Sequence, residues 1–206
     1  MKLYFSPGVC SLAPHIVLRE TGTPFELVRV DIRSHKVQDG NDYYQVNAKG
    51  SVPTLELDNG ERLTEGPVIS QYVADQAGNR ELVPAAGTME RYRVLEWLNY
   101  ITSELHKGYS VLFNPNIDAP TKTLFRAQLR KKYEWIESKL EGRKFLTGQN
   151  FTAADAYLFT VTRWAKVVEL DLSGLPALDA FNAAAASRPA VQAALEAEKA
   201  ASGKNH

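Results

Sequence analysis

The chain has 206 residues, enough for one large domain or two small ones, and its 24 basic and 24 acidic residues give a formal net charge of zero. With a pI near 6.9 it lacks the positive field that attracts nucleic acid, and a mean hydropathy of -0.29 with short apolar runs argues against a membrane span. With one cysteine and no signal-like N-terminal stretch, we expect a cytoplasmic protein that acts on small molecules.

The start of the chain places its only cysteine between a strand and a helix. An apolar stretch at residues 3–5 leads into the Pro7-Gly8 turn, then Cys10, and then a helical pattern that ends at Gly22. A thiol at the first turn of a helix meets free N–H groups and the positive end of the helix dipole, which lower its pKa. The setting predicts a reactive thiol, whereas a lone cysteine without context is more often a small buried apolar residue.

The following segments continue an alternation of strands and helices. Residues 25–32 alternate apolar and polar side chains, which predicts a strand, and an irregular polar segment follows as far as Gly50. Two short strands flank the Asn59-Gly60 turn signal, and Pro67 suits the first position of a further helix. This order predicts an α/β domain over residues 1–78.

A stretch rich in Gly, Pro and Ala over residues 79–87 indicates a linker, and no convincing strand follows it. Residues 88–206 are therefore predicted to form an all-helical domain. Thr152 and Asp155 form a shorter-armed version of the S/T-x-x-E capping box at the start of its third helix. Two long helices are expected before that one, over residues 88–112 and 121–140.

Six segments, in the right order, resemble those of a known family. They comprise residues 6–11, 47–55, 63–66, 96–100, 104–108 and 151–159. Together they resemble the bacterial beta class of cytosolic glutathione transferases, and the similarity runs from Met1 to about Leu195. The resemblance implies a thioredoxin-like glutathione-binding domain followed by a helical domain with the acceptor-substrate site. It further implies a homodimer that uses glutathione as co-substrate and needs no metal.

In the N-terminal domain the resemblance implies a glutathione site. A cis Val52-Pro53 bond would turn the Val52 backbone toward the bound peptide, although an X-Pro bond alone favours trans and a plain strand entry. Glu65 would bind the γ-glutamyl amine and the Gly66 N–H its carboxylate, while a carboxylate at a helix start also has a purely structural role. His35 stands where the family commonly has Lys and would meet the glycyl carboxylate; a solvated loop residue is the alternative.

On the first long helix, Asn99, Ser103, His106 and Lys107 lie at i, i+4, i+7 and i+8 and share a face. A solvated face explains this pattern equally well. The resemblance implies instead that His106 lies near the glutathione sulfur and Lys107 beside the acceptor site. It also implies that Asn99 and Ser103 complete the glutathione pocket of the other subunit. Two aromatic residues, which the pattern alone would place in the core, are implied as walls of the acceptor site: Tyr157 and Trp164.

The leading hypothesis is a detoxification reaction that conjugates the glutathione thiol to apolar electrophiles. Cys10, Ser11 and His106 are its predicted catalytic residues, and Cys10 is also a glutathione contact. An alternative is thiol-disulfide exchange, in which Cys10 forms a mixed disulfide with glutathione and needs no second cysteine. A further alternative is a non-catalytic module of the same fold that binds apolar ligands.

Overall fold

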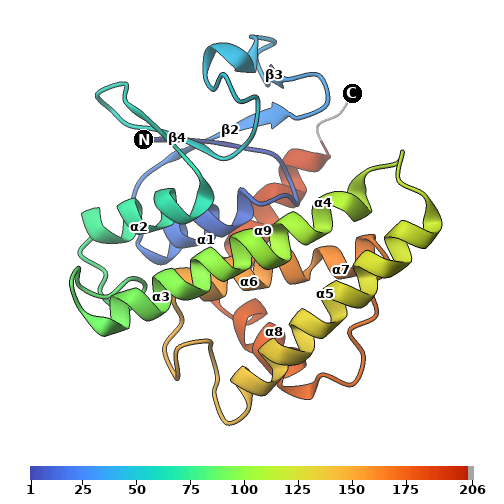
Figure 1. Cartoon of the computed structure of the whole chain (residues 1–206). Helices are drawn as coiled ribbons and strands as arrows, with labels where there is room; N and C mark the ends of the chain where they lie inside the picture. Colours follow the sequence, from blue (N-terminus) through green and yellow to red (C-terminus); the bar gives the residue numbers. More distant parts are fainter. Residues whose placement is uncertain (204–206) are drawn as a thin grey trace.

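A five-stranded sheet forms the N-terminal half of the computed structural model, which describes residues 1–203 (Figure 1). The strand order is β3-β2-β1-β4-β5; β1 and β2 are parallel, and the other neighbouring pairs are antiparallel. The strands are β1 (Lys2–Phe5), β2 (Glu26–Asp31), β3 (Lys36–Val37), β4 (Thr54–Glu56) and β5 (Arg62–Thr64). The expected strands are confirmed, and β3 is an addition that the short polar sequence around it did not predict.

Two helices belong to this half, α1 (Leu12–Glu20) and α2 (Gly66–Gln76), with a short 3-10 turn over Tyr43–Gln45. α1 packs against α2 and against the helical half through α6 and α9, so it is enclosed on every side. All residues from Leu12 to Leu18 are buried, as expected of a helix without a solvent face. α1 is therefore the core element that joins the sheet to the rest of the molecule.

The second half is helical, and within residues 1–203 no helix is long and apolar enough to cross a membrane. The mixed sheet followed by helices confirms the predicted fold class. The division into residues 1–78, 79–87 and 88–206 stays a prediction. The helices are α3 (Met89–Tyr100), η2 (Ile101–His106), α4 (Lys107–Phe113), α5 (Ala119–Leu140), α6 (Ala153–Thr162), α7 (Trp164–Val167), α8 (Pro176–Ala186) and α9 (Pro189–Ser202).

The predicted helix over residues 88–112 is interrupted by η2, a π-helical segment. The Lys107 N–H donates to the Thr102 carbonyl, five residues back, which adds one residue to a turn. Just beyond it, Gly108 packs so closely on α5 that an added Cβ would lie 2.8 Å from Leu129 Cδ2. The α-helical spacing of the predicted polar face is therefore wrong across this segment. His106 is half-buried, whereas Lys107 is exposed.

Polar contacts tie the turn before Cys10 to the helical half. The Gly8 N–H donates to Glu198 of α9 at 2.8 Å, and the Gly8 carbonyl accepts from Trp164 Nε1 at 2.9 Å. The other Glu198 oxygen lies 3.2 Å from Nδ1 of the fully buried His15. The backbone of this turn is thus held on both its N–H and its C=O by side chains of the other half.

The capping box at the start of α6 is confirmed. The Asp155 carboxylate is fully buried and accepts from the Thr152 N–H, the Thr152 hydroxyl and the Leu146 N–H. Burial raises the pKa of Asp155 to about 6, while the three donors act in the opposite direction. The same carboxylate thus caps α6 and fixes the loop that precedes it.

Candidate functional site

A cavity of about 340 Å³ lies between the N-terminal half and the helical half. Larger hollows of about 610 and 720 Å³ lie beside α7 and α8 and beside β2 and α9, but neither contains a predicted site residue. The smaller cavity brings together most of the predicted site residues, from both halves of the chain. Its predicted lining residues are Cys10, Val52, Pro53, Glu65 and Gly66 from the N-terminal half, and His106, Lys107 and Tyr157 from the helical half. The lining residues that sequence analysis missed are Lys49, Ser51, Pro67 and Thr102.

The Cys10 thiol is a hydrogen-bond donor in this cavity. Its Sγ lies 3.3 Å from the Val52 carbonyl oxygen, which accepts from the S–H. Burial raises the pKa of the Cys10 thiol to about 11, and Glu65 raises it further, while nearby backbone N–H groups and Lys107 act against them. The prediction of a lowered pKa is therefore wrong. The physical reason is that burial of the sulfur outweighs the backbone N–H groups of Cys10 and Ser11, which favour the thiolate.

Two backbone features of the N-terminal wall suit the binding of a peptide-like ligand. The Val52-Pro53 peptide bond is cis, as the resemblance implies. Glu65 adopts a left-handed φ of 68° immediately before Gly66 begins α2. The first N–H groups of a helix have no intrahelical carbonyl to bind, so this end of α2 is suited to an anion. The backbone of Val52, the N-terminus of α2 and the Glu65 carboxylate thus surround the same cavity.

A lysine already occupies the Glu65 carboxylate. Lys49 Nζ lies 2.5 Å from Glu65 Oε1 and 2.8 Å from the Thr64 hydroxyl oxygen. Both side chains of the ion pair are at least half exposed, so the pair is accessible to a competing charge. The two residues are distant in sequence, and no local pattern could have paired them. The carboxylate predicted to bind an amine therefore already binds one.

The helical wall centres on a hydrogen bond of 2.6 Å between His106 Nδ1 and the Tyr157 hydroxyl. Burial lowers the pKa of His106 to about 4, and the positive charge of Lys107 lowers it further. The imidazole is therefore neutral at physiological pH and acts by hydrogen bonding. The Trp164 ring packs edge-on against it with centroids 4.9 Å apart. Trp164 supports His106 from behind and is not among the residues that line the cavity.

Besides Trp164, four predicted residues do not line the cavity. His35 Nδ1 donates to the Gly50 carbonyl at 3.1 Å, and its ring stacks on Tyr44. The Ser11 hydroxyl is fully buried and donates to the Ser6 carbonyl, so its side-chain geometry lends no support to a thiolate contact. The other two predicted residues are exposed on the surface of this chain: Asn99 and Ser103.

Across the part of the chain that the structure describes, His, Cys, Asp and Glu side chains form no group of three suited to a metal ion. The arrangement offers instead a thiol, exposed backbone, a carboxylate paired with an ammonium, and a neutral imidazole. Such a set suits a zwitterionic peptide.

Both halves of the chain match domain models of a known protein family. The N-terminal domain model of glutathione S-transferases matches residues 8–76, and the C-terminal domain model matches residues 100–189. The glutathione S-transferase GstA of Escherichia coli O157:H7 is 50% identical over 198 residues, covering 96% of this chain and 98% of GstA.

Solved structures agree with this assignment. A sphingomonad glutathione S-transferase complexed with glutathione is 44% identical with a TM-score of 0.93, covering 97% of this chain and 99% of the other. A bacterial beta class glutathione S-transferase from Sphingomonas chungbukensis is 43% identical with a TM-score of 0.92, covering 96% and 98%. The chain belongs to the glutathione S-transferase family.

Proposed function

We propose that this protein conjugates the thiol of glutathione to apolar electrophiles. The observation that carries the proposal is the cavity in which Val52 backbone, the N-terminus of α2 and the Glu65 carboxylate surround the Cys10 thiol. The sphingomonad relative, whose solved structure is a complex with glutathione, supports the same ligand for this chain.

Glutathione matches the charges and hydrogen-bonding groups of the N-terminal wall. Its γ-glutamyl ammonium binds Glu65, and its γ-glutamyl carboxylate binds the Gly66 N–H at the start of α2. Its cysteinyl backbone pairs with the N–H and C=O of Val52 in the manner of an added strand. These contacts bring the ligand sulfur beside Cys10.

The protein activates the glutathione thiol by hydrogen bonding. Because the pKa of Cys10 is about 11, its thiol keeps its proton at neutral pH and can donate a hydrogen bond to the glutathione thiolate. His106 is neutral and contributes hydrogen bonding without charge. Holding the thiolate beside a bound electrophile replaces a bimolecular encounter with a reaction inside one complex.

The acceptor electrophile binds against the helical wall. Tyr157 and His106 present aromatic surface to the cavity, Lys107 lies at its rim, and Trp164 packs behind them. Apolar electrophiles with one polar group suit such a lining, because the aromatic rings supply contact area and His106 supplies a hydrogen bond.

The proposed working state is a cytoplasmic homodimer. α2 and α3 expose three large apolar side chains, which a second copy would cover: Val68, Met89 and Tyr92. In this dimer Asn99 of the partner subunit and Ser103 of the partner subunit complete the glutathione pocket. His35 remains a proposed contact of the glycyl carboxylate.

Thiol-disulfide exchange is the second candidate, because Cys10 lines the cavity and would lie beside the sulfur of bound glutathione. The raised pKa of Cys10 disfavours it as the attacking nucleophile in the free protein. Replacing Cys10 with Ala separates the two activities, since exchange would vanish, whereas conjugation would lose only the hydrogen bond from Cys10 and continue at a lower rate.

Binding and turnover of the purified protein test the leading proposal. Titration calorimetry with S-methylglutathione measures binding, and initial rates with 1-chloro-2,4-dinitrobenzene and an α,β-unsaturated ketone measure conjugation. Glu65→Gln keeps the side-chain shape but loses the charge, so the KM for glutathione should rise about tenfold or more. Glu61→Gln, an exposed change in the turn between β4 and β5, is the matched control. The absence of both binding and conjugation in the wild type would overturn the proposal.

A further inference from the structure

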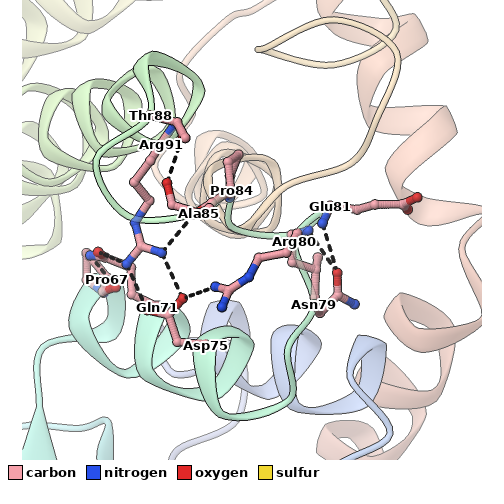
Figure 2. Close-up of polar contacts among 11 residues, drawn as sticks. Pro67, Gln71, Asp75, Asn79, Arg80, Glu81, Pro84, Ala85, Thr88 and Arg91 are labelled. Atoms are coloured by element: carbon pink, nitrogen blue, oxygen red, sulfur yellow. Dashed lines mark hydrogen bonds and ion pairs between the residues drawn. The ribbon is translucent and has the colours of Figure 1, made fainter.

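A buried arginine of the helical half forms hydrogen bonds and an ion pair with the N-terminal half (Figure 2). Arg91 of α3 forms a two-pronged ion pair with Asp75 of α2, Nη1 to Oδ1 and Nη2 to Oδ2, each at 2.9 Å. Nη1 also donates to the Pro84 carbonyl at 3.1 Å, and Nη2 to Gln71 Oε1 at 3.0 Å. The Arg91 side chain is 10% exposed. One guanidinium therefore joins α2, the linker and α3.

The contact with Gln71 fixes the direction of a side-chain amide. A guanidinium only donates hydrogen bonds, so the oxygen of Gln71 must face Arg91 and its NH₂ group must face the other way. On that side Gln71 Nε2 donates to the Pro67 carbonyl at 3.1 Å. Figure 2 shows the resulting chain of contacts from Arg91 through Gln71 to Pro67.

Pro67 belongs to the turn that carries the proposed contacts for the γ-glutamyl group. Proline has no N–H, and the N–H groups of Val68 and Ile69 both donate to the Glu65 carbonyl. Of the first four residues of α2, Gly66 alone keeps an N–H available for a ligand carboxylate. With one backbone donor, ligand affinity depends closely on how residues 65–67 are oriented.

We propose that Arg91 is a positioning residue that acts through Gln71 on residues 65–67 and so sets the affinity of this site for γ-glutamyl ligands. The proposal rests on the glutathione site proposed above. It assigns to the helical half a part in binding glutathione, in addition to its part in binding the electrophile. Arg91 itself lies outside the cavity and acts only through its neighbours.

Two substitutions at Gln71 separate this relay from general stability. Gln71→Glu still accepts from Arg91, so the guanidinium stays paired, but it has no N–H for the Pro67 carbonyl. Gln71→Met removes both contacts without adding charge. We expect both variants to raise the KM for glutathione about three- to tenfold, as the loss of one hydrogen bond predicts. The kcat at saturating glutathione and the KM for the electrophile should stay within about twofold.

Gln149→Glu, on an exposed loop outside the relay, controls for added charge and should keep the wild-type KM. Arg91→Lys keeps the charge but cannot reach all three partners at once, so it should match the Gln71 variants. If Arg91→Lys fails to fold, the Gln71 variants still test the positioning role. A wild-type KM in both Gln71 variants, or a lower melting temperature with no change in KM, would overturn the positioning role.

The result also separates this inference from the proposed function. If Glu65→Gln raises the KM for glutathione and the Gln71 variants do not, the site stands and the relay is rejected. If the wild type binds no S-methylglutathione, or Glu65→Gln leaves the KM unchanged, the glutathione site and the relay fall together.

Discussion

The two walls of the cavity are built differently. The N-terminal wall presents backbone groups at Val52 and Gly66 and an exposed carboxylate at Glu65. The helical wall presents buried aromatic side chains, with His106 joined to Tyr157 and backed by Trp164. Backbone donors and a fixed charge suit one defined ligand, whereas aromatic surface tolerates many shapes. Under the proposed function, one wall provides affinity for the thiol co-substrate and the other selects the electrophile.

The largest expected effect concerns Cys10, which lies between the walls. With a pKa of about 11, alkylation of Cys10 by iodoacetamide at about pH 8 should be about two orders of magnitude slower than that of a free thiol. The rate should rise about tenfold per pH unit up to about pH 10, as measured by intact mass. N-acetylcysteine is the reference compound. A plateau below about pH 8 would show a stabilised thiolate and would favour the exchange reaction.

A change at His106 should weaken binding of the electrophile and leave glutathione binding unchanged. His106→Asn loses the ring that packs against Trp164, so the KM for the electrophile should rise about three- to tenfold while the KM for glutathione holds. Because the pKa of His106 is lowered to about 4, the ring is neutral above about pH 5. The wild-type to variant ratio of kcat/KM should therefore stay flat between about pH 5.5 and about pH 8. An inflection near pH 6.5 in that ratio would contradict a neutral imidazole.

The smallest expected effect is a gain in affinity for glutathione from a substitution in the N-terminal wall. A Cβ added at Gly66 would lie 3.8 Å from Pro14 Cδ and Pro53 Cγ, which is ordinary contact, so a serine fits there. Gly66→Ser adds a hydroxyl donor beside the γ-glutamyl carboxylate and should lower the KM for glutathione about two- to fivefold. Gly66→Ala is the matched control without a donor. An equal gain in the alanine variant would attribute the effect to helix propensity.

Features that depend on neighbouring residues were predictable from the sequence. The capping box of Thr152 and Asp155 and the hairpin around Asn59-Gly60 rest on spacings of a few residues. The resemblance supplied the cis bond at Val52-Pro53, which the X-Pro preference alone would have made trans.

The features that sequence analysis missed depend on distant contacts. The π-helical segment lies beside the close approach of Gly108 to Leu129 on another helix. The raised pKa of Cys10 depends on how deeply the fold buries its sulfur. The approach of Lys49 to Glu65 depends on how a loop folds back over a hairpin. Local pattern says nothing about any of these distances.

The ion pair between Lys49 and Glu65 makes ligand binding an exchange of partners. In the proposed complex the γ-glutamyl ammonium displaces the Lys49 ammonium from Glu65, so the number of ion pairs at the carboxylate is the same before and after. Salt weakens an exposed pair in both states, and these two effects offset each other. If the proposed contact is right, this contact should therefore depend little on ionic strength.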